Sequence, residues 1–192
     1  MPKLLRSLLL CGGLSAGAGC QSYVVQDTAA DRYVPLTGGE LVLHRELTIP
    51  PGTAHVYMQR GQVVRGRNLY DTSCGLEVTD VRDTPQTVRP DSFAIVRAGA
   101  GMDEHLTAAP RHLAALGIGV RMGGFLAAED NGTPMVMYVI IMRLKSEDQP
   151  NVLNLTCRSA MDFPAYVDRL SLQQMQAALG PIATLHAATG AR

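Results

Sequence analysis

Histidine and acidic side chains gather in one stretch of the chain and are the first candidates for chemistry. Asp103, Glu104 and His105 are consecutive, and His112 follows beyond Pro110. Imidazole and carboxylate groups are zinc ligands, so this combination could hold a metal. The i, i+4 histidine pair of a helical zinc site is absent, however, and the proline interrupts a continuous helix. We therefore expect an exposed polar loop here, and no metal or other cofactor.

A second candidate is a cluster of three arginines around a predicted short strand, residues 62–65. Arg60 precedes this strand, Arg65 ends it and Arg67 follows it. Guanidinium groups so close in sequence could together bind an anionic sugar, phosphate or lipid A group. The alternative is that they form only the solvated face of a loop.

The enzyme motifs for which we searched are missing from Cys20 onward. That part of the chain has no G-x-S-x-G elbow, no H-E-x-x-H, no Gly-rich phosphate loop followed by Lys and no D-x-D calcium loop. Catalytic triads form in space and not in sequence, so an enzyme stays an alternative. With 17 basic and 17 acidic residues, the chain also lacks the net charge that would attract nucleic acid. We expect a protein that is not an enzyme and does not bind nucleic acid.

The first residues have the layout of a secretory signal. Lys3 and Arg6 precede an apolar run from Leu8 to Leu14, and small residues follow at 15–19. The apolar run is shorter than the roughly 20 residues that a membrane span needs. We expect residues 1–19 to be a signal peptide that a peptidase removes.

The end of this segment, Gly17-Ala18-Gly19-Cys20, resembles the bacterial lipobox. The resemblance implies a lipoprotein whose first mature residue, Cys20, carries acyl chains such as palmitate and holds the protein on a membrane. In that family an aspartate after the cysteine retains the protein at the inner membrane, so Gln21 implies the outer membrane. The rival is ordinary cleavage at Ala16-Gly17-Ala18, which would leave Cys20 as a free thiol.

The four cysteines bear on this choice. Cys11 would leave with the signal, and Cys74 and Cys157 make an even pair suited to an oxidising envelope. Ordinary cleavage would leave Cys20 as an unpaired, exposed thiol. Lipidation would convert that thiol to a thioether. Both Cys74 and Cys157 lie on the inward face of a predicted strand, so we expect a disulfide bond between them.

Alternating apolar residues predict a mainly β fold, either an antiparallel sandwich or an open barrel with one C-terminal helix. We expect strands around residues 41–49, 53–59, 62–65, 74–79, 92–97 and 152–158, and a long loop over 98–109. Residues 110–116 fit a short helix. Asn131-Gly132 predicts a hairpin between 118–128 and 133–145, whose second arm, apolar on both faces, should be a central strand. Ser171 and Gln174 form the capping box of a helix that ends at Gly180.

These patterns suggest a chain divided into four parts. After the signal peptide, residues 20–39 should be the lipidated cysteine and a flexible tether, and 40–181 a single β-rich domain. Residues 182–192 are expected to form a loose tail.

Several segments of the mature chain resemble a group of uncharacterised proteobacterial envelope lipoproteins. They are LTIPPGTAHVYMQRG, the run Cys74-Gly75-Leu76-Glu77-Val78, LKSEDQPNVLNLTC and SLQQMQAALG. The resemblance implies the compartment and the disulfide, and no activity. We expect a non-catalytic binding or accessory protein anchored to the outer membrane through Cys20, with its domain in the periplasm and an envelope protein or glycan as partner. The alternative is a periplasmic hydrolase or metal-dependent enzyme.

Overall fold

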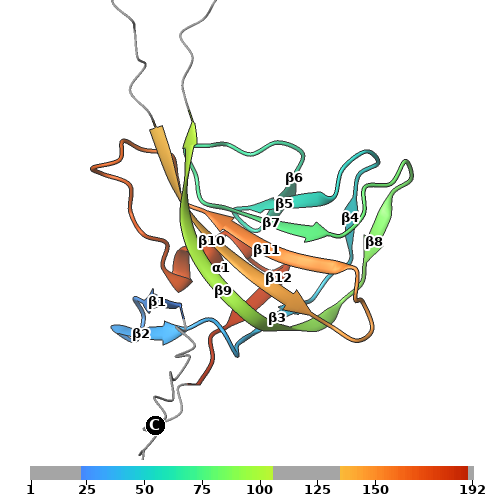
Figure 1. Cartoon of the computed structure of the whole chain (residues 1–192), viewed down its shortest axis with the longest axis horizontal. Coiled ribbons are helices and arrows are strands. Elements are labelled where there is room, and N and C mark those ends of the chain that lie inside the picture. The colour runs from blue at the N-terminus through green and yellow to red at the C-terminus, as the bar shows by residue number, and fades with distance from the viewer. Residues whose placement is uncertain (1–22, 106–134, 190–192) are drawn as a thin grey trace, which may run out of the picture.

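The computed structural model describes residues 23–105 and 135–189. Its main element is an eight-stranded sheet in which every neighbouring pair of strands is antiparallel (Figure 1). From one edge to the other, the sheet consists of β12 (Ala183–His186), β3 (Glu40–Leu43), β9 (Asp91–His105), β10 (Met135–Lys145), β11 (Val152–Arg158), β7 (Ser73–Val78), β5 (His55–Gln59) and β6 (Gln62–Val64).

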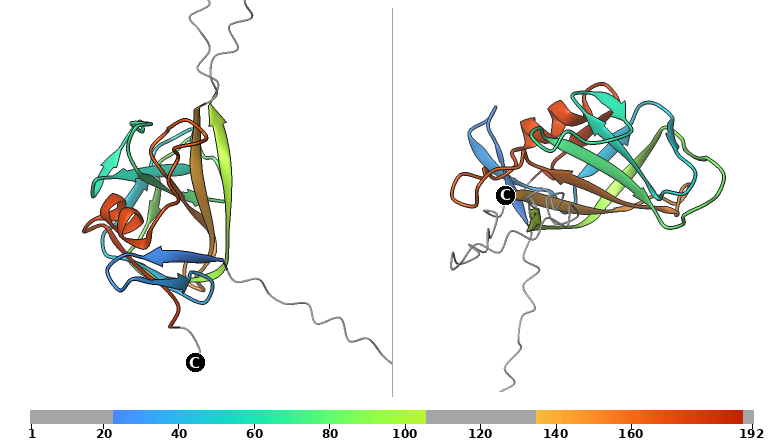
Figure 2. Two further views of the ribbon diagram at one scale, coloured as in Figure 1. Left: turned by 90° about the vertical axis from the view of Figure 1, so that its left-hand side faces the viewer. Right: turned by 90° about the horizontal axis from the view of Figure 1, so that it is seen from above.

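The sheet curls into an open half-barrel (Figures 1 and 2). Two short antiparallel pairs accompany it, β1 (Val24–Asp27) with β2 (Arg32–Pro35), and β4 (Leu47–Ile49) with β8 (Gln86–Val88). The helix α1 (Leu172–Leu179) packs against β1, β5, β7 and β12. This arrangement confirms the mainly β fold with a C-terminal helix, and its form is that of the open barrel.

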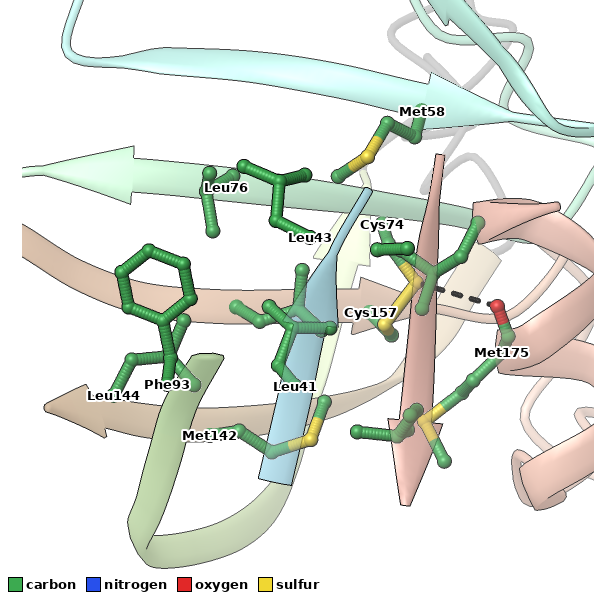
Figure 3. Packing of buried hydrophobic residues seen from close by; sticks show 14 of the residues in the cluster. Leu41, Leu43, Met58, Cys74, Leu76, Phe93, Met142, Leu144, Cys157 and Met175 are labelled. Atoms are coloured by element: carbon green, nitrogen blue, oxygen red, sulfur yellow. Dashed lines mark hydrogen bonds between the residues drawn. A yellow bond between two sulfur atoms is a disulfide. The ribbon is translucent and has the colours of Figure 1, made fainter. Parts of the chain in front are cut away.

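The inner face of the curled sheet carries the hydrophobic core. Residues that alternate along the predicted strands are buried there, among them Leu41, Leu43, Val56, Met58, Leu76 and Val78. Figure 3 shows several of these side chains converging between the strands and α1. The predicted strand over residues 41–49 is divided at residues 44–46 into β3 and β4, which belong to different sheets.

The Cys74–Cys157 disulfide is present, with both residues fully buried in this core (Figure 3). The two cysteines are directly opposite each other on neighbouring strands, β7 and β11. The bond therefore joins two segments 83 residues apart in sequence. It lies beside Met175 of α1, in the layer where helix and sheet meet.

The prediction of a long loop over 98–109 is wrong for residues 98–105. Strand β9 continues to His105 and pairs with β10 along almost its whole length, from Ala94↔Lys145 to His105↔Met135. Residues 98–102, AGAGM, have weak intrinsic strand preference, and pairing with the strongly β-forming strand β10 overrides it. The prediction that β10 is a central strand is confirmed by its interior position in the sheet. Three other predictions lie outside the described residues: the arm 118–128, the Asn131-Gly132 turn and the helix over 110–116.

With Cys157 facing inward, simple alternation along residues 152–158 predicts that Leu155 and Leu153 also face inward, and this prediction is wrong at the start of the strand. Leu155 and Cys157 are buried, but Leu153 is only half-buried and Val152 is buried instead. The register between β11 and β7 shifts between Val152 and Asn154, which marks a β-bulge. A bulge inserts one residue into one strand and so exchanges the two faces beyond it.

The predicted helix is confirmed with its cap. The Ser171 hydroxyl accepts a hydrogen bond from the backbone N–H of Gln174, and the Gln174 side chain accepts one from the backbone N–H of Ser171. Met175, Ala178 and Leu179 form the buried face. Gly180 ends the helix with a positive φ of 55°, a conformation that favours glycine.

Two boundaries differ from the expectation. Within the expected tether, residues 24–35 form the β1–β2 hairpin, in which Val25 and Val34 are buried. Within the expected loose tail, β12 pairs with β3 as an edge strand of the main sheet. Both segments were short and weakly patterned, and only contact with distant segments orders them. Within the described residues, no helix has the length and apolar character needed to cross a bilayer.

Candidate functional site

A mostly apolar cleft of about 630 Å³ lies along β5 and β6, where the edge of the main sheet faces the loops beside β4 and β8. We refer to it as the β5–β6 cleft. The apolar part of its wall consists chiefly of Pro50, Pro51, Val56, Val63, Val64 and Pro85, and its polar groups include His55, Tyr57 and Arg65. An apolar cleft with a few convergent polar groups is the usual form of a small-molecule site.

The edge strand β6 is held in place by a tight turn and by a buried glutamine. Arg60 and Gly61 both adopt positive φ, 51° and 71°, as a two-residue hairpin turn between β5 and β6 requires. The side chain of Gln59 is buried, donates to the carbonyls of Asn68 and Asp71 at 2.8 and 3.1 Å, and accepts from the Asn68 N–H at 3.0 Å. These bonds attach the loop after β6 to β5, so the outer wall of the cleft is well supported.

Tyr57 is the central aromatic residue of the site. Its ring centroid lies 4.6 Å from that of His55, two residues earlier on the same face of β5. On the neighbouring strand, the residue opposite Tyr57 is Gly75. A Cβ atom on Gly75 would lie only 3.1 Å from two atoms of the tyrosine ring, so the missing side chain leaves the space in which the ring lies.

The structure separates the three arginines of the sequence cluster. Arg65 lines the β5–β6 cleft, and the guanidinium of Arg67 lies over the Tyr57 ring, 5.2 Å from its centroid. Among the described residues, Nη1 of Arg67 is buried and has no hydrogen-bond partner. Arg60 instead forms an ion pair with Asp71, and its side chain is 78% exposed. Arg65 and Arg67 therefore lie near Tyr57, whereas the charge of Arg60 is balanced by that of Asp71.

His55 and Tyr57 were not among the sequence candidates, although the signal for them was present. The alternation of residues 53–59 places both on the outward face of the predicted strand. The pattern could not show that Pro50 and Pro51, which lie just before this strand, and Pro85, from a distant loop, would line one cleft with these residues. Chemically, the cleft combines apolar walls, an aromatic pair and an arginine, which suits binding of a molecule that is partly apolar and carries a negative charge.

The other sequence candidates fall at or beyond the limits of the described residues. His105 is the last residue of β9, and its side chain lies outside the described part of the chain. Cys20 and His112 lie outside it entirely. Within the part of the chain that the structure describes, no three His, Cys, Asp or Glu side chains come together as a possible metal site.

A second hollow, of about 420 Å³, lies between the β1–β2 hairpin, β9 and the residues that precede α1. Tyr23, Tyr33 and Arg169 line it. The hydroxyl groups of Tyr23 and Tyr138 are hydrogen-bonded at 2.7 Å, and burial together with this bond raises the pKa of Tyr23 above its usual range. Tyr23 is therefore neutral at physiological pH and serves to attach the hairpin to the sheet.

Comparison with known proteins gives no relative. No protein-family model, no curated protein and no solved structure matches the chain. The function must therefore be argued from the site itself.

Proposed function

We propose that this protein is an outer-membrane lipoprotein, anchored through Cys20, that acts as a non-catalytic binding or accessory protein of the bacterial envelope. The β5–β6 cleft is its ligand site in this proposal. The observation that carries the proposal is the character of the cleft: about 630 Å³ of space between proline and valine side chains, with Tyr57 and Arg65 in its wall.

The ligand class follows from the same wall. Burial of apolar surface supplies most of the binding free energy of such a site, about 25 cal/mol per Å². Arg65 adds one positive charge, and its planar guanidinium suits carboxylate or phosphate groups. We expect a ligand with an apolar part and one anionic group, the chemistry of acyl-chain and lipid-linked components of an envelope.

The proposal is tested by crosslinking in intact cells. A photoreactive amino acid at Val63, which lines the cleft and is 52% exposed, should form an adduct with an envelope component. The matched control is the same amino acid at Val81, which is 63% exposed and does not line the cleft. Equal yields at both positions, or none at Val63, would count against the cleft as the ligand site.

The anchor is tested separately by intact mass spectrometry of the protein extracted from membranes. Cleavage before Cys20 with added acyl chains is the expected mass. Cleavage after Ala18 with a free thiol at Cys20 would remove the anchor and the outer-membrane location from the proposal, and would leave the cleft untouched.

A further inference from the structure

Tyr23, which directly precedes the β1–β2 hairpin, is only three residues after Cys20. A fully extended chain spans at most about 3.6 Å per residue, so the Cα atoms of Cys20 and Tyr23 are within about 11 Å of each other. The polar layer on each side of a bilayer is itself several Å thick. If Cys20 carries the lipid, as the proposed function holds, the folded domain starts almost at the membrane surface.

The hairpin cannot swing away from the domain, because three sets of bonds fix it. The Tyr23 hydroxyl bonds to that of Tyr138, and the Pro35 carbonyl accepts from the Ala188 N–H at 2.9 Å. At the other end, Gln173 of α1 donates to Asp27 at 2.6 Å and accepts from the Thr28 N–H at 2.8 Å. The position of the anchor therefore determines which face of the whole domain approaches the membrane.

The outward face of the hairpin carries no charge. The opposed pairs Val24↔Pro35 and Gln26↔Tyr33 lie on one face, whereas Val25↔Val34 and Asp27↔Arg32 lie on the other, since successive residues of a strand alternate. The buried valines and the bond from Gln173 to Asp27 show that the second face is the inner one. The Asp27–Arg32 pair thus belongs to the inner face, where the Asp27 side chain is 13% exposed, although the Arg32 side chain extends into solvent and is 68% exposed. We define the hairpin face as Val24, Gln26, Tyr33 and Pro35.

The hairpin face has the composition of a membrane interface. The side chain of Tyr33 is 70% exposed and that of Val24 is 45% exposed. Tyrosine concentrates at the headgroup level of bilayers, because its ring is apolar and its hydroxyl is polar. Arg169 stands beside this face in the hollow that Tyr33 also lines, where its guanidinium can reach lipid phosphates.

We infer that the hairpin face rests on the phospholipid headgroup layer, with Tyr33 and Val24 in the interface and Arg169 toward the phosphates. This inference rests on the proposed lipid anchor at Cys20. The hairpin lies at one end of the long axis of the molecule, and β4 and β8 lie at the other (Figures 1 and 2). The β5–β6 cleft, whose wall includes Pro50 and Pro85 beside β4 and β8, then lies toward the end of the domain that is far from the membrane.

The test uses the absence of Trp from this sequence. Tyr33→Trp introduces a single fluorophore on the hairpin face. Tyr70→Trp is the matched control, because Tyr70 is 66% exposed and lies in the loop between β6 and β7, outside the hairpin face. The full lipoprotein is purified and inserted into vesicles of phosphatidylethanolamine and phosphatidylglycerol, with or without brominated acyl chains.

The expected result is a shift of the Tyr33→Trp emission to shorter wavelength, and loss of most of it with brominated lipid, while Tyr70→Trp is unchanged. Val24→Trp, on the same face, should respond as Tyr33→Trp does, so the outcome does not depend on a single variant. Lipoprotein that floats with vesicles but shows equal quenching for Tyr33→Trp and Tyr70→Trp overturns this inference alone. Protein that neither floats nor carries acyl chains by mass overturns the anchor, and the inference with it.

Discussion

Gly61 and Gly180 lie backbone against backbone, where the turn between β5 and β6 meets the end of α1. The Gly61 N–H donates to the carbonyl of Ala178 at 3.0 Å, and both glycines have positive φ. A Cβ atom on Gly180 would overlap the Cα atom of Gly61. This contact attaches the edge strand β6, one wall of the β5–β6 cleft, to the helix.

Gly180→Ala should therefore destabilise the protein by more than backbone strain alone. A positive φ costs a non-glycine residue at least about 1 kcal/mol, and overlap with the Gly61 backbone should bring the loss to about 2–4 kcal/mol. Gly52→Ala is the matched control, because Gly52 also has a positive φ, 73°, and a Cβ atom there would meet nothing within 4 Å. Chemical unfolding of the purified variants measures the difference, and equal losses would show that the glycine contact is not tight.

Arg65 and Arg60 should differ in their effect on ligand binding. Anilinonaphthalene sulfonate, which joins apolar rings to one sulfonate, is a suitable probe of the β5–β6 cleft. Arg65→Ala should weaken its binding about tenfold, equivalent to about 1.4 kcal/mol, because a charge-assisted contact is lost. Arg60→Ala should leave binding unchanged, since Arg60 is paired with Asp71. Fluorescence titration gives both dissociation constants, and equal effects would show that only overall charge matters.

The Cys74–Cys157 disulfide should supply a large part of the stability. Joining residues 83 apart stabilises the fold by about 4.5 kcal/mol on the chain-entropy model. We expect the double variant Cys74→Ala/Cys157→Ala to lose about 2–5 kcal/mol of unfolding free energy. Both cysteines are fully buried, so a reductant without denaturant should leave them unavailable to alkylation, which mass spectrometry detects. An unchanged unfolding midpoint in the double variant would contradict this role.

Asp91 should make the stability depend on pH in the acid range. Burial alone would raise the pKa of Asp91, but hydrogen bonds from Ser146, Gln149 and the Ser92 N–H lower it below the ordinary value. In the unfolded chain that value is about 3.9. The unfolded state thus binds the proton more readily, so the stabilisation is present above this value and is lost as pH falls through the lower pKa of the folded state.

Urea unfolding at several pH values measures this effect. The series runs from neutral pH to about pH 3, which lies below the ordinary pKa of aspartate. Asp91→Asn should be less stable at neutral pH and should lose less on acidification. Asp83→Asn, at an exposed position between β7 and β8, is the control and should follow the unaltered protein. Some acid dependence should remain in Asp91→Asn, because a hydrogen bond from Gln173 also lowers the pKa of Asp27. Parallel pH curves for Asp91→Asn and the unaltered protein would contradict the assignment.

Local features of this fold follow from local sequence. The alternation of Ala54, Val56 and Met58, the capping box of Ser171 and Gln174, and the inward phase of Cys74 and Cys157 each depend on neighbours a few residues away. Such patterns express strand pleating, helix capping and the burial of apolar groups. The sequence by itself therefore determined the mainly β class, the C-terminal helix and the disulfide pair.

The tertiary structure decided what depends on distant partners. Residues 98–105 are a strand because β10 pairs with them, and residues 183–186 are a strand because β3 does. The β1–β2 hairpin is ordered by Tyr138 and Gln173, both more than 100 residues away. Likewise, Arg65 lines the β5–β6 cleft whereas Arg60 pairs with Asp71. The closeness of these arginines in sequence does not reveal this difference. Pairing and packing across the chain set these positions, because the free energy that holds them comes from contacts that no local pattern contains.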